Sequence, residues 1–247
     1  MKFTILRFES VDSTNTVAAD HARMGADEGL CVIAGRQTAG RGRHGRLWLS
    51  EPGSGLYFSI VLRPRIEIRY LPLVTLMSGV AVYDTLAELR LKPDIKWVND
   101  VLVGDRKICG ILAEMLETGS GTAVVVGIGI NLNDGNFADR SASFATSIKA
   151  QTGTAIAADE LAARLTVHLG RFYGVLQGEC GPAEILDEWR RRSSYFRGKS
   201  VRVTLADDAF TGITDGLEEN GALRVKISDG SVRIVQAGDI ERLREQH

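Results

Sequence analysis

The chain has 247 residues, a formal net charge of −1 and 44% hydrophobic residues, so it is long enough for a large domain and a smaller one and too evenly charged to coat nucleic acid. Three scattered cysteines without a Cys-x-x-Cys pair argue against a disulfide framework or a zinc site. The first ten residues are too short and too charged for a signal peptide, and no apolar run approaches membrane-spanning length, so we expect a cytoplasmic protein with neither a DNA nor a membrane partner.

The first sixty residues predict strands around one helix. Residues 3–10 (FTILRFES) have a strand pattern, and residues 11–25 have a helix pattern that begins with the N-cap candidates Asp-Ser-Thr and stops at Gly25. Two further apolar runs, residues 29–38 and 55–64, predict strands on either side of a loop rich in glycine and arginine.

The middle of the chain predicts a helix, a hairpin and a strand. Residues 71–89 carry an apolar stripe at helical spacing that is interrupted by Asp84, which indicates a core-facing helix with a polar notch. Residues 94–115 contain β-rich runs with a turn at Gly104-Asp105, as in a hairpin. Residues 122–133 have the apolar character of a buried strand that ends in a glycine- and asparagine-rich loop.

The last third of the chain changes from helical to β patterns. Residues 159–176 and 182–193 predict two helices, and residues 198–243 hold short alternating strands with turn residues between them, as in a small β-barrel. We therefore expect a catalytic domain over residues 1–194 and a β-barrel domain over residues 195–247. Because helices are expected to cover one face of a mixed sheet, the fold class of the main domain is α+β.

The stretch GRGRHGR, residues 40–46, combines three glycines with three arginines. Glycine lets backbone N–H groups approach an anion closely, and arginine adds a planar, permanently charged fork that fits phosphate or carboxylate oxygens. The loop lacks the Gly-Lys-Ser/Thr of a Walker loop, and it opens no helix as a dinucleotide fingerprint does, because Trp48 indicates a return strand. It predicts a small anionic ligand, with a solvated, RNA-binding or merely flexible basic loop as the alternative.

Two later stretches add polar candidates. The predicted hairpin carries Asn99, Asp100 and Lys107 beside Lys96, although each of these alone could be a turn residue or a solvated strand residue. The glycine pair within residues 126–133 (VGIGINLN) could simply make a tight turn from strand to loop.

Five motifs together resemble those of the biotin protein ligases. In chain order they are STN at 13–15, QTAGRGRHGRLW at 37–48, KWVND at 96–100, KICGIL at 107–112 and GIGINLN at 127–133. The resemblance covers nearly the whole chain and implies a mixed-sheet catalytic domain of the class II aminoacyl-tRNA synthetase and biotin ligase type, followed by an SH3-like β-barrel. Val98 stands where the family usually has proline. No winged-helix domain precedes the first strand, so we expect the form without an N-terminal DNA-binding domain, with no repressor role.

The resemblance implies a ligase that works in two steps. Biotin and ATP give biotinyl-5′-AMP and pyrophosphate, with Mg²⁺ as the metal, and biotin then passes to a lysine of a biotin carboxyl carrier protein or domain of a biotin-dependent carboxylase. A homodimer is a further implication. Lipoate ligases and octanoyl transferases share the broad fold, but they carry an Arg-Arg-x-Ser-Gly-Gly-Gly loop that this chain lacks.

The resemblance also implies the site residues. It assigns biotin to Ser13, Thr14, Asn15, Gln37, Gly40, Arg41, Lys107, Gly110 and Ile111. It assigns ATP to Arg41, Gly42, Arg43, Arg46, Trp48, Asn99, Asp100, Lys107 and Asn131. The expected catalytic residues are Lys107, Arg41 and Arg43, and the expected Mg²⁺ ligands are Asp100 and Asn131. For Trp48, stacking on adenine and burial in the hydrophobic core both remain open.

Overall fold

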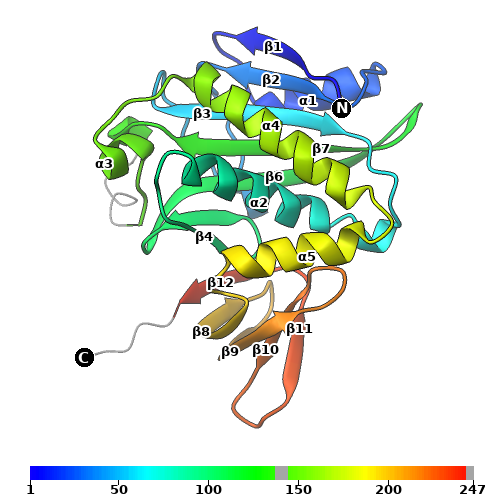
Figure 1. Ribbon diagram of the computed structural model, residues 1–247, viewed down its shortest axis with the longest axis vertical. Helices are drawn as coiled ribbons and strands as arrows, with labels where there is room; N and C mark the ends of the chain where they lie inside the picture. The colour runs from blue at the N-terminus through cyan, green and yellow to red at the C-terminus, as the bar shows by residue number, and fades with distance from the viewer. Residues whose placement is uncertain (137–143, 243–247) are drawn as a thin grey trace.

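Two β-sheets organise the chain (Figure 1). The computed structural model describes residues 1–136 and 144–242. The larger sheet has seven strands in the order β1-β2-β3-β7-β6-β5-β4; β1 and β2 are parallel, and every other neighbouring pair is antiparallel. Its strands are β1 (Thr4–Phe8), β2 (Leu30–Ala34), β3 (Gly55–Leu62), β4 (Pro93–Lys96), β5 (Asp100–Val103), β6 (Arg106–Thr118) and β7 (Gly121–Asn131).

The helices follow the sequence pattern closely. Those in the described residues are α1 (Thr14–Arg23), α2 (Leu73–Ala87), α3 (Ile148–Thr152), α4 (Ala158–Leu176) and α5 (Gly181–Arg192). The four longer helices confirm the expected ones, and Gly25, at φ 92°, lies just beyond the end of α1. The short α3 was not predicted; it is held by the Ser147 side chain, which accepts from the Ala150 amide, and it stops at the left-handed Gly153.

Alternation along the strands gives the large sheet two different faces. The even-numbered residues of β7 between 124 and 130 pack in the main core with α2 and α4, while the odd-numbered residues at the start of the strand pack against α1. The next odd-numbered residues are Gly127 and Gly129, which add no side chain to the second face. The expectation that helices cover one face only was therefore wrong for α1, because its small buried residues Ala18 and Ala22 fit against that second face.

Helix α2 is the centre of the main core. The stretch Ile68–Ala87 has the length and mean hydropathy of a membrane-spanning helix, which corrects the expectation that no apolar run approaches that length. The reason is burial: α2 packs against the sheet, α4 and α5, so 11 of its 15 residues are buried. Its predicted polar notch is real, because both carboxylate oxygens of Asp84 accept from Arg192 of α5, at 2.6 and 3.0 Å.

The C-terminal strands form a second, antiparallel sheet in the order β11-β10-β9-β8-β12. They are β8 (Arg197–Thr204), β9 (Ala209–Leu217), β10 (Leu223–Lys226), β11 (Val232–Val235) and β12 (Asp239–Arg242). This sheet lies beyond α5 in Figure 1 and shares the apolar core of the first domain. The buried indole of Trp97 donates to the Gly221 carbonyl at 2.9 Å, and a Cβ at Gly221 would lie 2.7 Å from Leu76 of α2. The two sheets are therefore tightly packed on each other.

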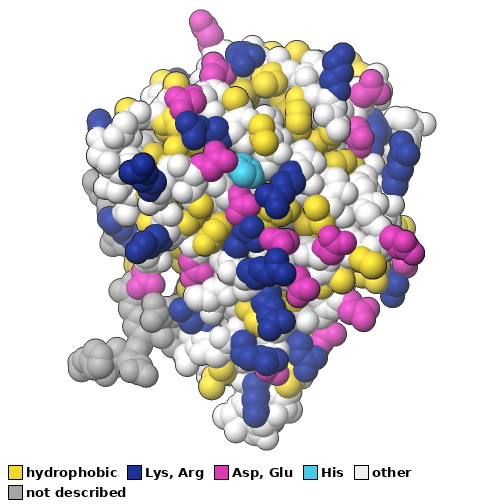
Figure 2. Space-filling model, viewed as in Figure 1, with side chains coloured by type: hydrophobic (Ala, Val, Ile, Leu, Met, Phe, Trp, Pro, Cys, Tyr) yellow, Lys and Arg dark blue, Asp and Glu magenta, His cyan; other side chains and the backbone are white. Residues whose placement is uncertain are grey.

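Charges of both signs are interspersed on the face that carries α4 and α5, as Figure 2 shows. Ion pairs between Arg164 and Glu160 and between Arg191 and Glu188 lie along these helices. Such mixing on this face agrees with the near-neutral composition.

Candidate active site

Three glycines on the second face of the large sheet form the floor of a pocket. Gly110 of β6 pairs with Gly129 of β7. Gly127 lies two residues before Gly129 in β7 and therefore on the same face of the sheet. A Cβ at Gly129 would lie 2.6 Å from the indole nitrogen of Trp48, and one at Gly110 would lie 2.8 Å from the same ring. A Cβ at Gly127 would lie 2.9 Å from Cγ of Asn15. The missing side chains thus make the room that Trp48 and Asn15 occupy.

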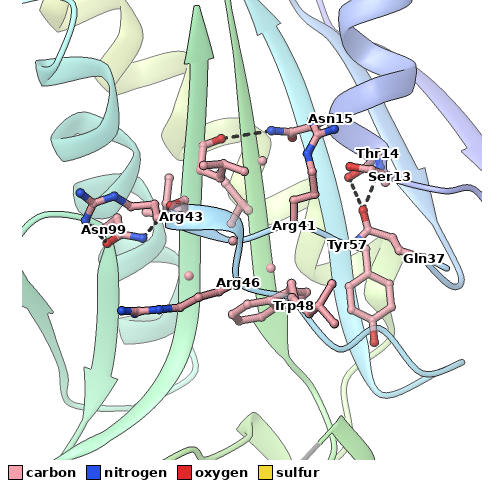
Figure 3. Close-up of a pocket in the computed structure, with 18 of the residues that line it drawn as sticks. Ser13, Thr14, Asn15, Gln37, Arg41, Arg43, Arg46, Trp48, Tyr57 and Asn99 are labelled. Atoms are coloured by element: carbon pink, nitrogen blue, oxygen red, sulfur yellow. Dashed lines mark hydrogen bonds between the residues drawn. The ribbon is translucent and has the colours of Figure 1, made fainter. Parts of the chain in front are cut away.

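A chain of hydrogen bonds forms the wall at the start of α1 (Figure 3). Oε1 of Gln37 accepts from both the amide and the hydroxyl of Thr14, at 2.8 and 3.0 Å, and Nε2 of Gln37 donates to Ser50 at 2.9 Å. The hydroxyl oxygens of Ser59 on β3 and of Thr14 lie 2.7 Å apart. Ser13, which is buried, completes this wall. The wall offers amide and hydroxyl groups that both donate and accept.

The glycine- and arginine-rich loop folds back on itself beside the floor. The Trp48 amide donates to the Gly40 carbonyl at 2.9 Å, and the Gly42 amide donates to the Arg46 carbonyl at 2.7 Å. The positive φ angles lie at the tip, in a 3₁₀ turn over Arg43–Gly45, where His44 and Gly45 have φ 54° and 71°. Gly40 is instead needed for close packing, because a Cβ there would lie 2.9 Å from Ser50 Oγ.

Two arginines of this loop are paired with carboxylates. Nη2 of Arg41 donates to both oxygens of Glu114 on β6, at 2.9 and 3.1 Å. Arg46 forms an ion pair with Asp239, at the start of β12. The loop is therefore fixed at one end to the large sheet and at the other to the C-terminal sheet.

Lys107 lies over the floor between a carboxylate and an aromatic ring. Its Nζ is 2.6 Å from Asp100 Oδ1 and 5.4 Å from the centre of the Trp48 ring. Asp100 stands opposite Gly110 in the β5–β6 pairing, and Lys96 approaches its other oxygen at 3.9 Å. One carboxylate thus contacts two ammonium groups, of which only Lys107 lines the pocket.

Arg43 differs from the other cations because its hydrogen-bond acceptors are neutral. Its Nη1 donates to Oδ1 of Asn99 and to the carbonyl of Gly238, each at 3.2 Å. Burial lowers the pKa of the Arg43 guanidinium, and the charges of Asp239 and Asp100 act in the opposite direction. Arginine keeps its charge throughout the physiological range, so Arg43 is the pocket cation whose charge is least neutralised by direct contact.

Comparisons with known proteins agree with this geometry. The model of the biotin/lipoate A/B protein ligase family matches residues 7–131, and that of the biotin protein ligase C-terminal domain matches residues 196–243. The bifunctional ligase/repressor BirA of Bacillus subtilis is 34% identical over 96% of this chain and 73% of its own length. The chain belongs to the biotin protein ligase family.

Two further relatives of this ligase match it over nearly their whole length as well as its own. The biotin–[acetyl-CoA-carboxylase] ligase of Paracoccus denitrificans is 32% identical over 93% of this chain and 96% of its own. The biotin protein ligase from Aquifex aeolicus, solved in complex with biotin and ATP, superposes with a TM-score of 0.83 at 28% identity over 97% of this chain and 99% of its own. The expected α+β catalytic domain with a C-terminal β-domain is confirmed.

Most of the residues expected to bind substrates line one pocket of the ligase, with about 780 Å³ of empty space that is partly open to solvent. Those that line it are Ser13, Thr14, Asn15, Gln37, Arg41, Gly42, Arg43, Arg46, Trp48, Asn99, Asp100, Lys107, Gly110 and Ile111. Gly40 and Asn131 do not. Gly40 packs beneath the loop, and Asn131 is buried with its amide donating to Thr146 at 3.0 Å. Trp48 is half-buried over the floor, and its Nε1 has no hydrogen-bond partner among the described residues.

Sequence reasoning missed three residues that line the pocket of the ligase, Gly127, Gly129 and Asp239, and also Glu114, which contacts Arg41 beside it. Gly127 and Gly129 lie in the GIGINLN motif, which indicates the family but assigns neither glycine to a substrate. Glu114 could have been found from strand alternation, since it is two residues beyond Leu112 and four residues beyond Gly110 on the same face of β6. Asp239 had no local signal, because it reaches the pocket from the C-terminal sheet.

Proposed function

We propose that this ligase makes biotinyl-5′-AMP in the glycine-floored pocket and then transfers biotin to a lysine of a biotin carboxyl carrier protein. The main support is the pocket itself, in which four cations and a wall of donors and acceptors surround one floor. The solved relative from Aquifex aeolicus holds biotin and ATP together on the same fold. Two anionic substrates need such a concentration of positive charge to meet.

The biotin ring is proposed to lie against the start of α1. A ureido group both donates and accepts hydrogen bonds, and Ser13, Thr14 and Gln37 supply partners of both kinds. Ile111 borders the pocket, but its side chain lies in the main core on the other face of the sheet, so the apolar contact is assigned to Leu112 of β6. Arg41 then receives the carboxylate at the other end of the substrate, since its planar fork matches two oxygens.

In the first step a carboxylate oxygen of biotin attacks the α-phosphorus of ATP, and the bond to the pyrophosphate oxygen breaks with its electron pair. Two unit charges about 4 Å apart repel by about 4 kcal/mol at an effective dielectric near 20. Lys107 and Arg43, which both line the pocket, offset that repulsion and stabilise the charge that develops on the phosphoryl oxygens. Trp48 offers a ring face to the adenine.

In the second step the acceptor lysine attacks the acyl carbon of the adenylate as a free amine. The C–N bond forms, the bond to the phosphate oxygen breaks, AMP leaves, and the amine loses its proton to solvent or to a nearby carboxylate. Names of relatives support the carrier partner, because those from Paracoccus denitrificans and Mycobacterium tuberculosis are named as biotin–[acetyl-CoA-carboxylase] ligases.

Of the two residues expected to bind magnesium, only Asp100 lines the pocket. Mg²⁺ in nucleotide sites takes one or two protein carboxylates together with phosphate oxygens. Asp100 lies in the pocket and could hold the ion, which would neutralise charge on the triphosphate, whereas Asn131 lies outside it. In residues 1–136 and 144–242 there is no cluster of three or more acidic, histidine or cysteine side chains arranged for a metal.

We further propose a ligase without a repressor role. The two matched family regions account for both domains that the structure describes, and neither is a DNA-binding domain. A mobility-shift assay of the purified chain with duplex DNA, with and without biotin and ATP, is expected to show no complex.

The decisive experiment uses the purified chain with ATP, Mg²⁺ and biotin. Biotin-dependent exchange of pyrophosphate into ATP is expected, followed by labelling of one lysine when a carrier domain is added. Replacing biotin with lipoate is expected to abolish both signals. Labelling with lipoate and not with biotin would instead assign the chain to the lipoate branch of the family.

Lys107→Met tests the central residue of the mechanism. Loss of one preorganised donor to a transition state typically costs about 10²–10³ in rate, so exchange is expected to fall by about that factor while the fold is kept. Lys92→Met removes an exposed lysine outside the pocket and serves as the matched control. Exchange within twofold of wild type in Lys107→Met would contradict the assignment.

A further inference from the structure

The guanidinium group that the mechanism assigns to the substrate carboxylate already binds a carboxylate of the protein. Nη2 of Arg41 contacts both oxygens of Glu114, and Nη1 donates to Thr16 at 3.2 Å. The Arg41 and Glu114 side chains are 45% and 40% exposed, so solvent reaches both partners. A half-exposed pair of this kind is weak enough to exchange its anion.

Glu114 is held in place by a second set of hydrogen bonds. Nδ2 of Asn15 donates to Oε2 of Glu114 at 2.7 Å and to the Leu112 carbonyl at 3.3 Å. Oδ1 of Asn15 accepts from Ser59 at 2.6 Å, so both ends of the amide are engaged. Asn15 therefore orients Glu114, and this contact does not need Arg41.

This geometry also shows what becomes of Glu114 when Arg41 is taken by another anion. The carboxylate keeps the Asn15 amide as a partner and keeps its solvent exposure. Displacement would therefore not leave a buried, unpaired charge, which is the costly outcome for interior ion pairs.

We propose that Glu114 and the substrate carboxylate compete for Arg41, so that biotin binds by carboxylate exchange. The proposal rests on the function proposed above and concerns affinity and selectivity within that site. An uncharged analogue cannot replace Glu114 on the guanidinium. The exchange thus ties release of Arg41 to the presence of the acid group that reacts.

Glu114→Gln is the direct test. Glutamine keeps the length of the side chain and an oxygen for Asn15, but it removes the charge that competes for Arg41. The Kd for biotin, measured by calorimetry, is expected to fall by about 1.5- to 5-fold, the equilibrium equivalent of a half-exposed ion pair. The Kd for biotinol, which has a hydroxyl in place of the carboxylate, is expected to stay unchanged.

Two controls separate exchange from other causes. Glu117→Gln removes a charge from the exposed part of the same strand, where Glu117 accepts a hydrogen bond from the Thr122 hydroxyl. It is expected to change neither Kd. In an Arg41→Met background, Glu114→Gln is expected to lose its effect on biotin.

Three outcomes decide the matter. Weaker biotin binding in Glu114→Gln would show that Glu114 only positions Arg41. Equal changes in the Kd for biotin and for biotinol would show that Glu114 acts on the fold. Either result overturns the exchange proposal and leaves the ligase assignment intact. Failure of the wild-type chain to bind biotin at all would overturn the proposed function, and exchange with it.

Discussion

At the scale of single residues, the absence of side chains creates the site. Gly110, Gly127 and Gly129 lie where the sheet would otherwise present three side chains to the second face, and Trp48 and Asn15 fill part of that space. The sequence left open whether Trp48 stacks on adenine or is buried in the hydrophobic core. In the structure it lies half-buried in the pocket and not in the main core. Its stacking on adenine stays a prediction.

Gly129→Ala is predicted to disable the pocket while the chain still folds. The added Cβ would overlap the indole of Trp48, so the ring must shift, and overpacking of this kind costs about 1–3 kcal/mol of stability. Biotin-dependent exchange is expected to fall at least tenfold, with a shift in tryptophan emission. Gly174→Ala in α4 meets nothing within 4 Å and is the matched control; it should raise stability by about 0.5–1 kcal/mol and leave exchange unchanged. Unaltered emission and exchange in Gly129→Ala would contradict this account of the floor.

At the scale of elements, the glycine- and arginine-rich loop contacts both sheets. One of its arginines reaches β6 and another reaches the start of β12, while Arg43 donates to the carbonyl of Gly238 just before β12. The C-terminal sheet thereby takes part in shaping the pocket. This gives the β-domain a specific task, which is to hold the part of the loop around Arg43 and Arg46.

Asp239→Asn is predicted to loosen that side of the loop. Without the charge on Asp239, Arg46 loses its ion pair and the loop opens more often, so trypsin should cut after Arg43 or Arg46 several times faster than in wild type. The KM for ATP is expected to rise more than the KM for biotin. Asp207→Asn changes an exposed aspartate of the same domain outside the pocket, and it should alter neither cleavage nor KM. Equal cleavage of both variants would show that the ion pair does not hold the loop.

At the scale of the whole molecule, two buried cysteine thiols in the shared core limit the stability of the fold at high pH. Burial raises the pKa of the Cys31 thiol to about 12, and burial raises the pKa of Cys109 as well. An unfolded thiol ionises near pH 8.5–9, so above that pH the unfolded state loses protons that the folded state keeps. The stability contributed by Cys31 is therefore fully present below about pH 9 and is lost as the pH rises towards 12.

Urea unfolding between pH 8 and 10.5 measures this effect. The free energy of unfolding of wild type should fall with pH, with up to about 1.4 kcal/mol per pH unit from Cys31. Cys31→Ala is expected to be less stable at pH 8 but to show a shallower fall. Cys180→Ala removes an exposed thiol and should keep the wild-type slope. Equal slopes in wild type and Cys31→Ala would mean that this thiol does not carry the pH dependence.

The amino-acid sequence by itself determined the longer helices, the β5–β6 hairpin with its turn at Gly104-Asp105, the strand β7, and the motifs that indicate the family, because each of these depends on residues close together in the chain. Tertiary structure alone decided which face α1 covers and which carboxylates Arg41 and Arg46 contact. Arg41 and Glu114 are 73 positions apart, and Arg46 and Asp239 are 193 apart. Such partners meet only through strand order and the docking of the second sheet, and no local pattern encodes either.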